Sequence, residues 1–243
     1  MMKPKIGITI DSFNPELNEA GRDYSAYYWY AMRSHVVNAV VQCGGIPVLL
    51  SHHVEIVDEY ADMLDGLIIS GGGLDVPPEY YGEKPHKNFR PNLKRSAFEK
   101  AIAEKFIENK KPLLGICGGM QLLAVLYGGK LYQCLNDENC FDTHDQKQPY
   151  SNPAHTVDYQ VGTKLWSLIG KPAESVGVNT VHRQGVKDAG RLVVNAISTN
   201  DGLIEGIEDA NHPFCIGVQW HPEFICSHYD EQIFIQLIKS AQA

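Results

Sequence analysis

The chain has 243 residues, of which 44% are hydrophobic and 21% charged, and its formal net charge is −8. This composition excludes a largely disordered chain, and the acidic balance argues against nucleic acid or an anionic membrane as the main partner. No Pro/Ser-rich linker divides the chain and no apolar run approaches the roughly 20 residues of a membrane span, so we expect one domain over residues 1–243 that binds a small molecule.

The cysteines and the N-terminus bear on the cellular compartment. Six cysteines lie at no repeated spacing, at positions 43, 117, 134, 140, 215 and 226. The N-terminal stretch lacks the basic-then-apolar form of a signal peptide. We therefore expect a cytoplasmic protein with reduced thiols.

The first half of the chain alternates short apolar runs with helical patterns, in the order typical of an α/β protein. The patterns predict strands at 5–10, 46–50 and 66–69, and helices at 25–42, 54–63 and 93–109. Three glycines at 71–73 follow the third strand, and the irregular stretch 74–92, rich in proline and tyrosine, comes next. Long loops at strand ends tend to carry function, so we expect these segments near the site.

The stretch 111–133 organises the rest of the chain. An apolar run at 112–116 leads into Cys117, and apolar residues at helical spacing follow, with Gly115 and Gly119 two positions to either side. This is the pattern of a nucleophile elbow, where a tight strand-to-helix turn leaves no room for side chains. The helix start favours the thiolate, and the Gly118 amide points to where an oxyanion would form. The paired glycines disfavour the alternative, a cysteine that is merely part of the core.

The second half begins with a predicted strand at 130–134. The polar segment 136–153 carries Cys140, His144 and Asp145, which could ligate a metal, but their spacing matches no zinc pattern. We interpret the segment as a loop and expect no metal site. Further strands are predicted at 155–161, 192–198, 202–207 and 214–220, as a more antiparallel extension of the sheet, and a closing helix at 229–239.

The strand at 214–220 ends in His221-Pro222-Glu223. Side chains two apart on an extended segment face the same side, so Glu223 can orient the imidazole of His221. Cys117, His221 and Glu223 are thus candidates for nucleophile, base and orienting carboxylate. His182 lies in another polar stretch, where a substrate contact and a plain strand edge are equally compatible with the pattern.

These motifs together resemble the class I glutamine amidotransferase superfamily. The signature is a Gly-x-Cys-x-Gly-x-Gln elbow with a later His-x-Glu, present here as Gly115, Cys117, Gly119, Gln121, His221 and Glu223. Within the superfamily the chain is most similar to the gamma-glutamyl-gamma-aminobutyrate hydrolase group, peptidase family C26. The segments that carry this similarity are IGIT near the start, 44–50, 80–83, 128–133, 178–184 and 202–205.

The resemblance implies a three-layer α/β/α sandwich, flavodoxin-like, and hydrolysis of a gamma-glutamyl amide through a thioester on Cys117, with no cofactor. It implies that the amide of Gly118 and one from the glycine loop, Gly72 or its neighbour Gly73, hold the oxyanion. Gln121 and His182 are the further residues expected on the substrate side.

Two departures from the group bear on the substrate. The group usually has Arg after the nucleophile, where this chain has Gly118, and Asp where this chain has Ser96. Two other functions fit the sequence: a glutaminase subunit that delivers ammonia to a synthetase, and a non-catalytic binding protein on the same fold. Glutaminase subunits are usually shorter and lack a loop like residues 74–92, so the presence of this loop favours the free-standing hydrolase. The sequence leaves open the amine half of the substrate and the oligomeric state, a homodimer included.

Overall fold

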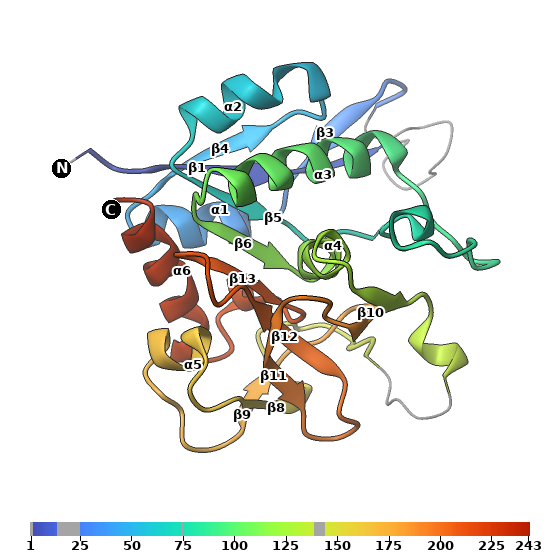
Figure 1. Ribbon diagram of the computed structural model, residues 1–243, viewed down its shortest axis with the longest axis vertical. Helices are drawn as coiled ribbons and strands as arrows, with labels where there is room; N and C mark the ends of the chain where they lie inside the picture. Colours follow the sequence, from blue (N-terminus) through green and yellow to red (C-terminus); the bar gives the residue numbers. More distant parts are fainter. Residues whose placement is uncertain (1, 14–24, 74, 139–143) are drawn as a thin grey trace.

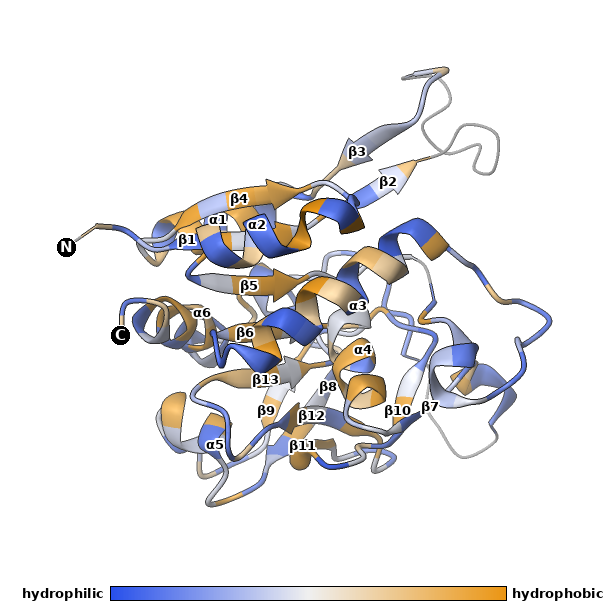
Figure 2. Ribbon diagram, turned by 45° about the horizontal axis from the view of Figure 1, so that its top comes forward, coloured by the Kyte–Doolittle hydropathy of each residue, from blue (hydrophilic) through white to orange (hydrophobic). Residues whose placement is uncertain are grey.

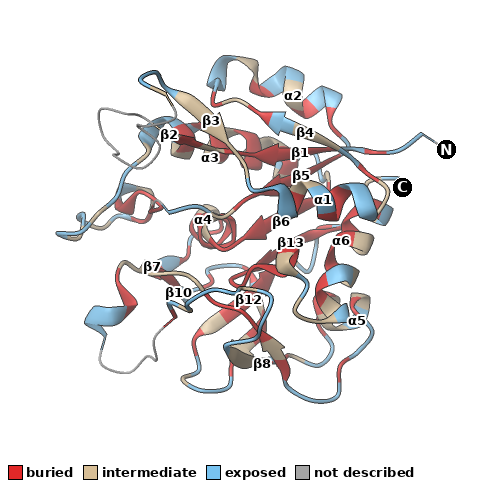
Figure 3. Cartoon of the chain, turned by 180° about the vertical axis from the view of Figure 1, so that it is seen from behind, coloured by how far each residue is buried: buried red, intermediate tan, exposed pale blue. Residues whose placement is uncertain are grey.

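The computed structural model describes residues 2–13, 25–73, 75–138 and 144–243 (Figure 1). In this part of the chain, eleven strands form one sheet. Five neighbouring strands are parallel, in the order β4 (Ile46–Leu50), β1 (Lys5–Thr9), β5 (Gly66–Ile69), β6 (Leu113–Ile116) and β13 (Cys215–Val218). The last three are buried along their whole length, as Figure 3 shows for the centre of the sheet. Burial on both faces suits their continuous apolar sequences.

The sheet continues from β13 in antiparallel fashion, which confirms the predicted extension. The strands that follow in order are β12 (Ile204–Glu208), β11 (Val193–Ser198), β8 (His155–Tyr159) and β9 (Val176–Val178). Off this path, β10 (Gly185–Asp188) pairs with both β12 and β7 (Lys130–Tyr132). Antiparallel neighbours can be joined by short turns, so this half needs no crossover helices.

Helices cover both faces of the sheet, as Figure 2 illustrates. One apolar core contains side chains of α2 (Val57–Met63), α3 (Leu93–Glu108) and α4 (Gly118–Leu126). The other contains side chains of α1 (Ser34–Gln42), α5 (Lys164–Leu168) and α6 (His228–Ser240).

The strands supply both cores, because successive side chains of a strand point to opposite faces. Leu67 and Ile69 of β5 belong to the first core, while Ile68 between them belongs to the second. The predicted three-layer α/β/α sandwich is thereby confirmed. Among the helices of the described residues, none combines the length and apolarity that crossing a membrane needs.

The predicted helix at 25–42 is wrong in its first part. The structure has a strand there, β3 (Trp29–Ala31), which pairs antiparallel with β2 (Asp11–Phe13), and the helix begins only at Ser34. Neighbouring aromatic side chains favour strands, and the rings of Phe13 and Trp29 stack with centroids 4.5 Å apart. The sequence interpretation also missed the short elements β9, β10 and α5.

Candidate active site

The turn between β6 and α4 has the strained geometry expected of a nucleophile elbow. Cys117 adopts φ 53° and ψ −107°, a region that residues with side chains rarely occupy. A Cβ on Gly119 would lie 2.1 Å from the main-chain oxygen of Ile69, and a Cβ on Gly115 would lie 2.7 Å from the backbone of Gly119. The two glycines are therefore required for helix α4 to start this close to the sheet.

The ends of two adjacent parallel strands bring Cys117 and His221 together. Ile116 is in register with Val218, so the residues that follow β6 and β13 meet at one edge of the sheet. A Cβ built on Gly71 would lie 3.1 Å from Cβ of Cys117 and 2.9 Å from Cε1 of His221. Both side chains thus border the same glycine.

Glu223 lies beside His221, in the 3₁₀ turn Pro222–Phe224. Its Oε1 is 2.8 Å from Nδ1 of His221, and both side chains are buried. The main chain of His221 is fixed as well, since its N–H donates to the Asn179 side chain at 2.8 Å and its carbonyl accepts from that side chain at 2.9 Å. With Nδ1 engaged by the carboxylate, Nε2 of His221 is the ring nitrogen available to a thiol.

The charges of this cluster favour a thiolate and an imidazolium. Burial opposes ionisation of Cys117, but the attraction of His221 and a hydrogen bond from it outweigh burial, so the pKa of Cys117 is lowered. Burial would likewise lower the pKa of His221, yet the negative charges of Glu223 and Cys117 raise this pKa to about 10. The pair can therefore be ionised at neutral pH.

Arg95 holds the glycine loop from behind. Its Nη2 donates to the main-chain oxygens of Ser70 at 2.8 Å and Gly71 at 3.2 Å. The guanidinium is itself fixed by ion pairs with Glu99 at 2.8 Å and Asp11 at 3.3 Å. A trans peptide points its C=O and N–H in opposite directions, so the N–H that follows the Gly71 carbonyl points away from Arg95.

A cavity of about 300 Å³ opens in front of Cys117. All five of the remaining predicted site residues line it: Gly72, Gly73, Gly118, Gln121 and His182. His221 and Glu223 line a second cavity of about 300 Å³, which shares Gly72 and Gly73 with the first. The glycine loop thus forms a wall between the two.

Most polar atoms of Gln121 and His182 contact other groups of the protein rather than the cavity. The Gln121 amide donates to the Gln184 carbonyl at 2.9 Å and to the Gln219 side chain at 3.0 Å. Nδ1 of His182 lies 2.9 Å from the same Gln184 carbonyl, and its Nε2 lies 3.6 Å from Oε1 of Glu205. That Gln121 and His182 contact the substrate stays a prediction, because their side chains keep few hydrogen-bond donors for it.

Sequence reasoning assigned none of the charged residues of the cavity to the active site. They are Asp75, Arg90, Asp145 and Arg183, of which only Asp145 was considered, as a metal ligand. Asp75 pairs with the Arg183 side chain and accepts from the main-chain N–H of Arg90 at 2.8 Å. Within the described residues, the buried Nη1 of Arg183 has no hydrogen-bond partner. None of the four lies in a helix or a named strand, so no local periodicity marks them.

The sequence of the chain matches a known family over most of its length. Residues 4–223 match peptidase C26. The chain belongs to this family. A glutamine amidotransferase-like protein of Rickettsia prowazekii is 31% identical over 280 aligned positions, which cover 99% of this chain and 98% of the relative. The gamma-glutamyl-gamma-aminobutyrate hydrolase PuuD of Escherichia coli is 33% identical, with 82% of this chain and 80% of the relative covered.

Solved structures share the fold at low sequence identity. A GMP synthase protein of Thermoplasma acidophilum superposes with a TM-score of 0.64 at 17% identity, over 100% of this chain and 96% of that one. The glutaminase domain of a Trypanosoma brucei CTPS superposes with a TM-score of 0.60 at 16% identity, over 98% and 94%. The fold is that of glutaminase domains, and this member of the C26 family is a hydrolase of the glutamine amidotransferase-like class.

Proposed function

We propose that the protein hydrolyses gamma-glutamyl amides through a thioester on Cys117, with Cys117, His221 and Glu223 as its catalytic triad. The observation that carries the proposal is the strained, buried Cys117 beside an imidazole that a carboxylate orients at 2.8 Å. The relatives named as gamma-glutamyl-gamma-aminobutyrate hydrolases support the substrate class.

In the proposed first step, the Cys117 thiolate attacks the gamma-carbonyl carbon, and the carbonyl electrons move onto oxygen. The amides of Gly118 and Gly72 hold the oxyanion, since Arg95 takes the Gly71 carbonyl and leaves the Gly72 N–H pointing away from it. When the C–N bond breaks, His221 gives its proton to the departing amine. A thioester to Cys117 remains, and His221 is neutral.

In the second step, neutral His221 takes a proton from water, and the hydroxide attacks the thioester carbon. The carbon–sulfur bond breaks and glutamate leaves. Cys117 returns as the thiolate and His221 as the imidazolium, so the ion pair is restored with no net change. Glu223 keeps its charge throughout and stabilises the imidazolium.

The 74–92 loop favours a free-standing hydrolase over a glutaminase subunit. Buried Val76 donates its main-chain N–H to the Gln184 side chain at 2.9 Å, and the His86 N–H donates to the Gln133 side chain at 2.8 Å. Gln133 in turn donates to Glu83 at 3.0 Å. The described part of this loop, residues 75–92, is thus held by contacts within the chain, which supports a loop that is ordered without a partner.

A substrate panel tests the proposed function. The purified protein alone should turn over a gamma-glutamyl amide such as gamma-glutamyl-aminobutyrate, and should release ammonia from glutamine more slowly. We expect this because a larger amine offers more binding energy to spend in the transition state. No turnover of any gamma-glutamyl amide, with glutaminase activity appearing only when a synthetase is added, would instead establish the glutaminase role.

The pH profile of kcat/KM should be bell-shaped, because the mechanism needs the thiolate and the imidazolium together. Activity rises as Cys117 ionises and falls as His221 loses its proton, near pH 10. Glu223→Gln removes the charge that helps to raise the pKa of His221, so the alkaline limb should move to lower pH. Glu231→Gln makes the same charge change on the exposed side of α6 and should leave the profile unchanged. An alkaline limb that stays in place in Glu223→Gln would contradict the assignment.

Arg183 lines the cavity of Cys117, and its Nη2 pairs with Asp75 while its Nη1 has no hydrogen-bond partner among the described residues, so we assign it the carboxylate of the glutamyl moiety. Arg183→Gln should raise KM for gamma-glutamyl amides about tenfold or more with a smaller change in kcat. Arg183→Lys keeps a positive charge to pair with Asp75 but lacks the second N–H group, Nη1, that would bind the carboxylate, so KM should still rise. Lys187→Gln, an exposed charge nearby, is the control. Equal KM values in all variants would show that the carboxylate binds elsewhere.

A further inference from the structure

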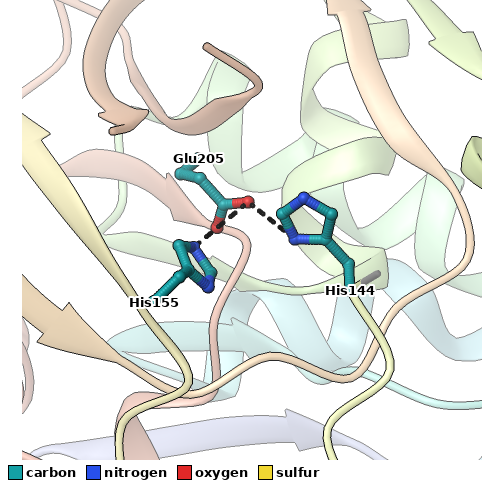
Figure 4. Close-up of side chains that lie close together, drawn as sticks. All are labelled: His144, His155 and Glu205. Atoms are coloured by element: carbon teal, nitrogen blue, oxygen red, sulfur yellow. Dashed lines mark ion pairs between the residues drawn. The ribbon is translucent and has the colours of Figure 1, made fainter. Parts of the chain in front are cut away.

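A second cluster of ionisable side chains lies apart from the triad. Figure 4 shows His144 and His155 pointing toward the carboxylate of Glu205. His155 opens strand β8 and Glu205 lies on β12, while His144 precedes the bridge between Asp145 and Val181. Glu205 has no exposed surface, and the side chains of both histidines are buried. Two histidines from separate segments therefore approach one buried carboxylate on a third.

The cluster is poorly satisfied by hydrogen bonds. Oε1 of Glu205 lies 3.7 Å from Nδ1 of His144, 3.8 Å from Nε2 of His155 and 3.6 Å from Nε2 of His182. Within the described residues, neither oxygen of Glu205 has a hydrogen-bond partner, nor has Nε2 of His155. Burying a carboxylate whose neighbouring imidazole nitrogens lie 3.6 to 3.8 Å away is costly, so a cation bound closer to it would stabilise the fold.

Asp201 sets the proton position on His144. Its Oδ2 lies 2.9 Å from Nε2 of His144, which places the ring proton on Nε2 and leaves the lone pair of Nδ1 directed toward Glu205. The Thr180 hydroxyl lies 3.2 Å from Nδ1 of His144 and 3.4 Å from the main-chain oxygen of His144. When the hydroxyl donates to the main-chain oxygen, the lone pair of Nδ1 is left for a metal ion. A carboxylate behind a ligating histidine is the usual outer shell of a protein metal site.

We propose that His144 Nδ1, His155 Nε2 and Glu205 bind a divalent transition metal of the zinc type. The three ligand atoms lie within 4.8 Å of one another. Bonds of about 2.1 Å in a tetrahedral site place ligand atoms about 3.4 Å apart. The two distances from Oε1 of Glu205 to the histidine nitrogens, 3.7 and 3.8 Å, therefore need to shrink by only a few tenths of an ångström. A cavity of about 220 Å³, lined by both histidines and Asp201, gives the ion an entry path and water a place at the fourth position.

This site differs from the one that the polar segment 136–153 suggested. Of the three metal-capable residues there, only His144 takes part. Asp145 is exposed and pairs with Lys147 at 3.8 Å, and Cys140 lies outside the described residues. His182 lies near the same Glu205 oxygen and also lines the cavity of Cys117, so a bound ion would fix the wall between metal site and active site.

Zinc titration of the metal-stripped Cys117→Ala protein tests the proposal, because this variant cannot bind zinc through the active-site thiol. We expect one Zn²⁺ per chain by calorimetry and by metal analysis, and a rise in Tm of roughly 5–10 °C when free zinc is 100 times Kd. X-ray absorption at the zinc edge should give imidazole nitrogen and carboxylate oxygen neighbours without sulfur. In the same background, Asp201→Asn should weaken zinc binding about 10–100-fold, and His155→Ala should abolish it.

His53→Ala, which removes an exposed histidine, should leave zinc binding unchanged. Absence of stoichiometric zinc binding in the folded Cys117→Ala protein, or sulfur among the neighbours of the bound ion, would overturn the site. So would a His155→Ala variant that folds and keeps full affinity. Because the decisive titration and spectrum use a protein with an intact cluster, they do not depend on whether the ligand variants fold.

Discussion

Replacing Cys117 by alanine should lower kcat for any gamma-glutamyl amide by about 10⁴-fold or more, while the fold remains intact. Alanine fits the elbow because its side chain is smaller than that of cysteine. The variant loses the interaction with His221 and a long contact of the thiol with the Val181 carbonyl, at 4.0 Å. Steady-state assays check the loss of activity. A far-UV circular dichroism spectrum equal to that of the wild type checks that the fold is intact. Cys43→Ala, which removes a partly exposed thiol, should keep full activity.

A Cys117→Ala variant that kept most of its activity would end the thioester mechanism. Chemical labelling gives independent evidence on the same residue. Iodoacetamide should label Cys117 first among the described thiols, because its pKa is lowered while burial raises that of Cys215 to about 12. Mass spectrometry of the rapidly quenched wild-type enzyme should also find the gamma-glutamyl group on the peptide that carries Cys117.

Residues that act through local backbone geometry could be predicted from the sequence. The elbow needs glycines at fixed distances from Cys117, and His221 and Glu223 share one short segment, so spacing alone indicated their arrangement. Burial of β5, β6 and β13 on both faces likewise follows from their uninterrupted apolar runs.

Residues brought together by tertiary structure could not be predicted in this way. Arg95 reaches the glycine loop from helix α3, and Glu205 meets His144 and His155, which lie 61 and 50 residues earlier in the chain. No periodicity encodes such encounters, since they depend on the order of strands in the sheet. The strand at Trp29 was missed for another reason. Among the described residues it pairs with the three-residue strand β2, outside the main sheet, so no long apolar run marks it in the sequence.

The adjacent glycines 118 and 119 should respond in opposite ways to substitution by alanine. In Gly119→Ala the new Cβ would meet the Ile69 carbonyl oxygen at 2.1 Å and its carbon at 2.9 Å. These atoms belong to the backbone of the central strand β5, which cannot move aside as a side chain would. We expect a loss of about 3 kcal/mol or more in the free energy of unfolding, seen as a fall in Tm of roughly 6–12 °C or as insoluble protein.

Gly118→Ala should be neutral or should stabilise the protein by about 0.4–1 kcal/mol, because it restricts the unfolded chain and meets no resistance. A Cβ at position 118 has no heavy atom within 4 Å among the described residues. Because position 118 also lines the cavity of about 300 Å³, Gly118→Arg, which restores the residue usual in the group, can direct its side chain into that cavity, and stability should again change little. Denaturant unfolding of the three variants checks the contrast, and equal destabilisation at both positions would contradict the close approach of α4 to β5. Since position 118 borders the cavity of Cys117 and a Cβ there meets no described residue, we expect the side chain at 118 to vary with the substrate in this family while Gly119 cannot change.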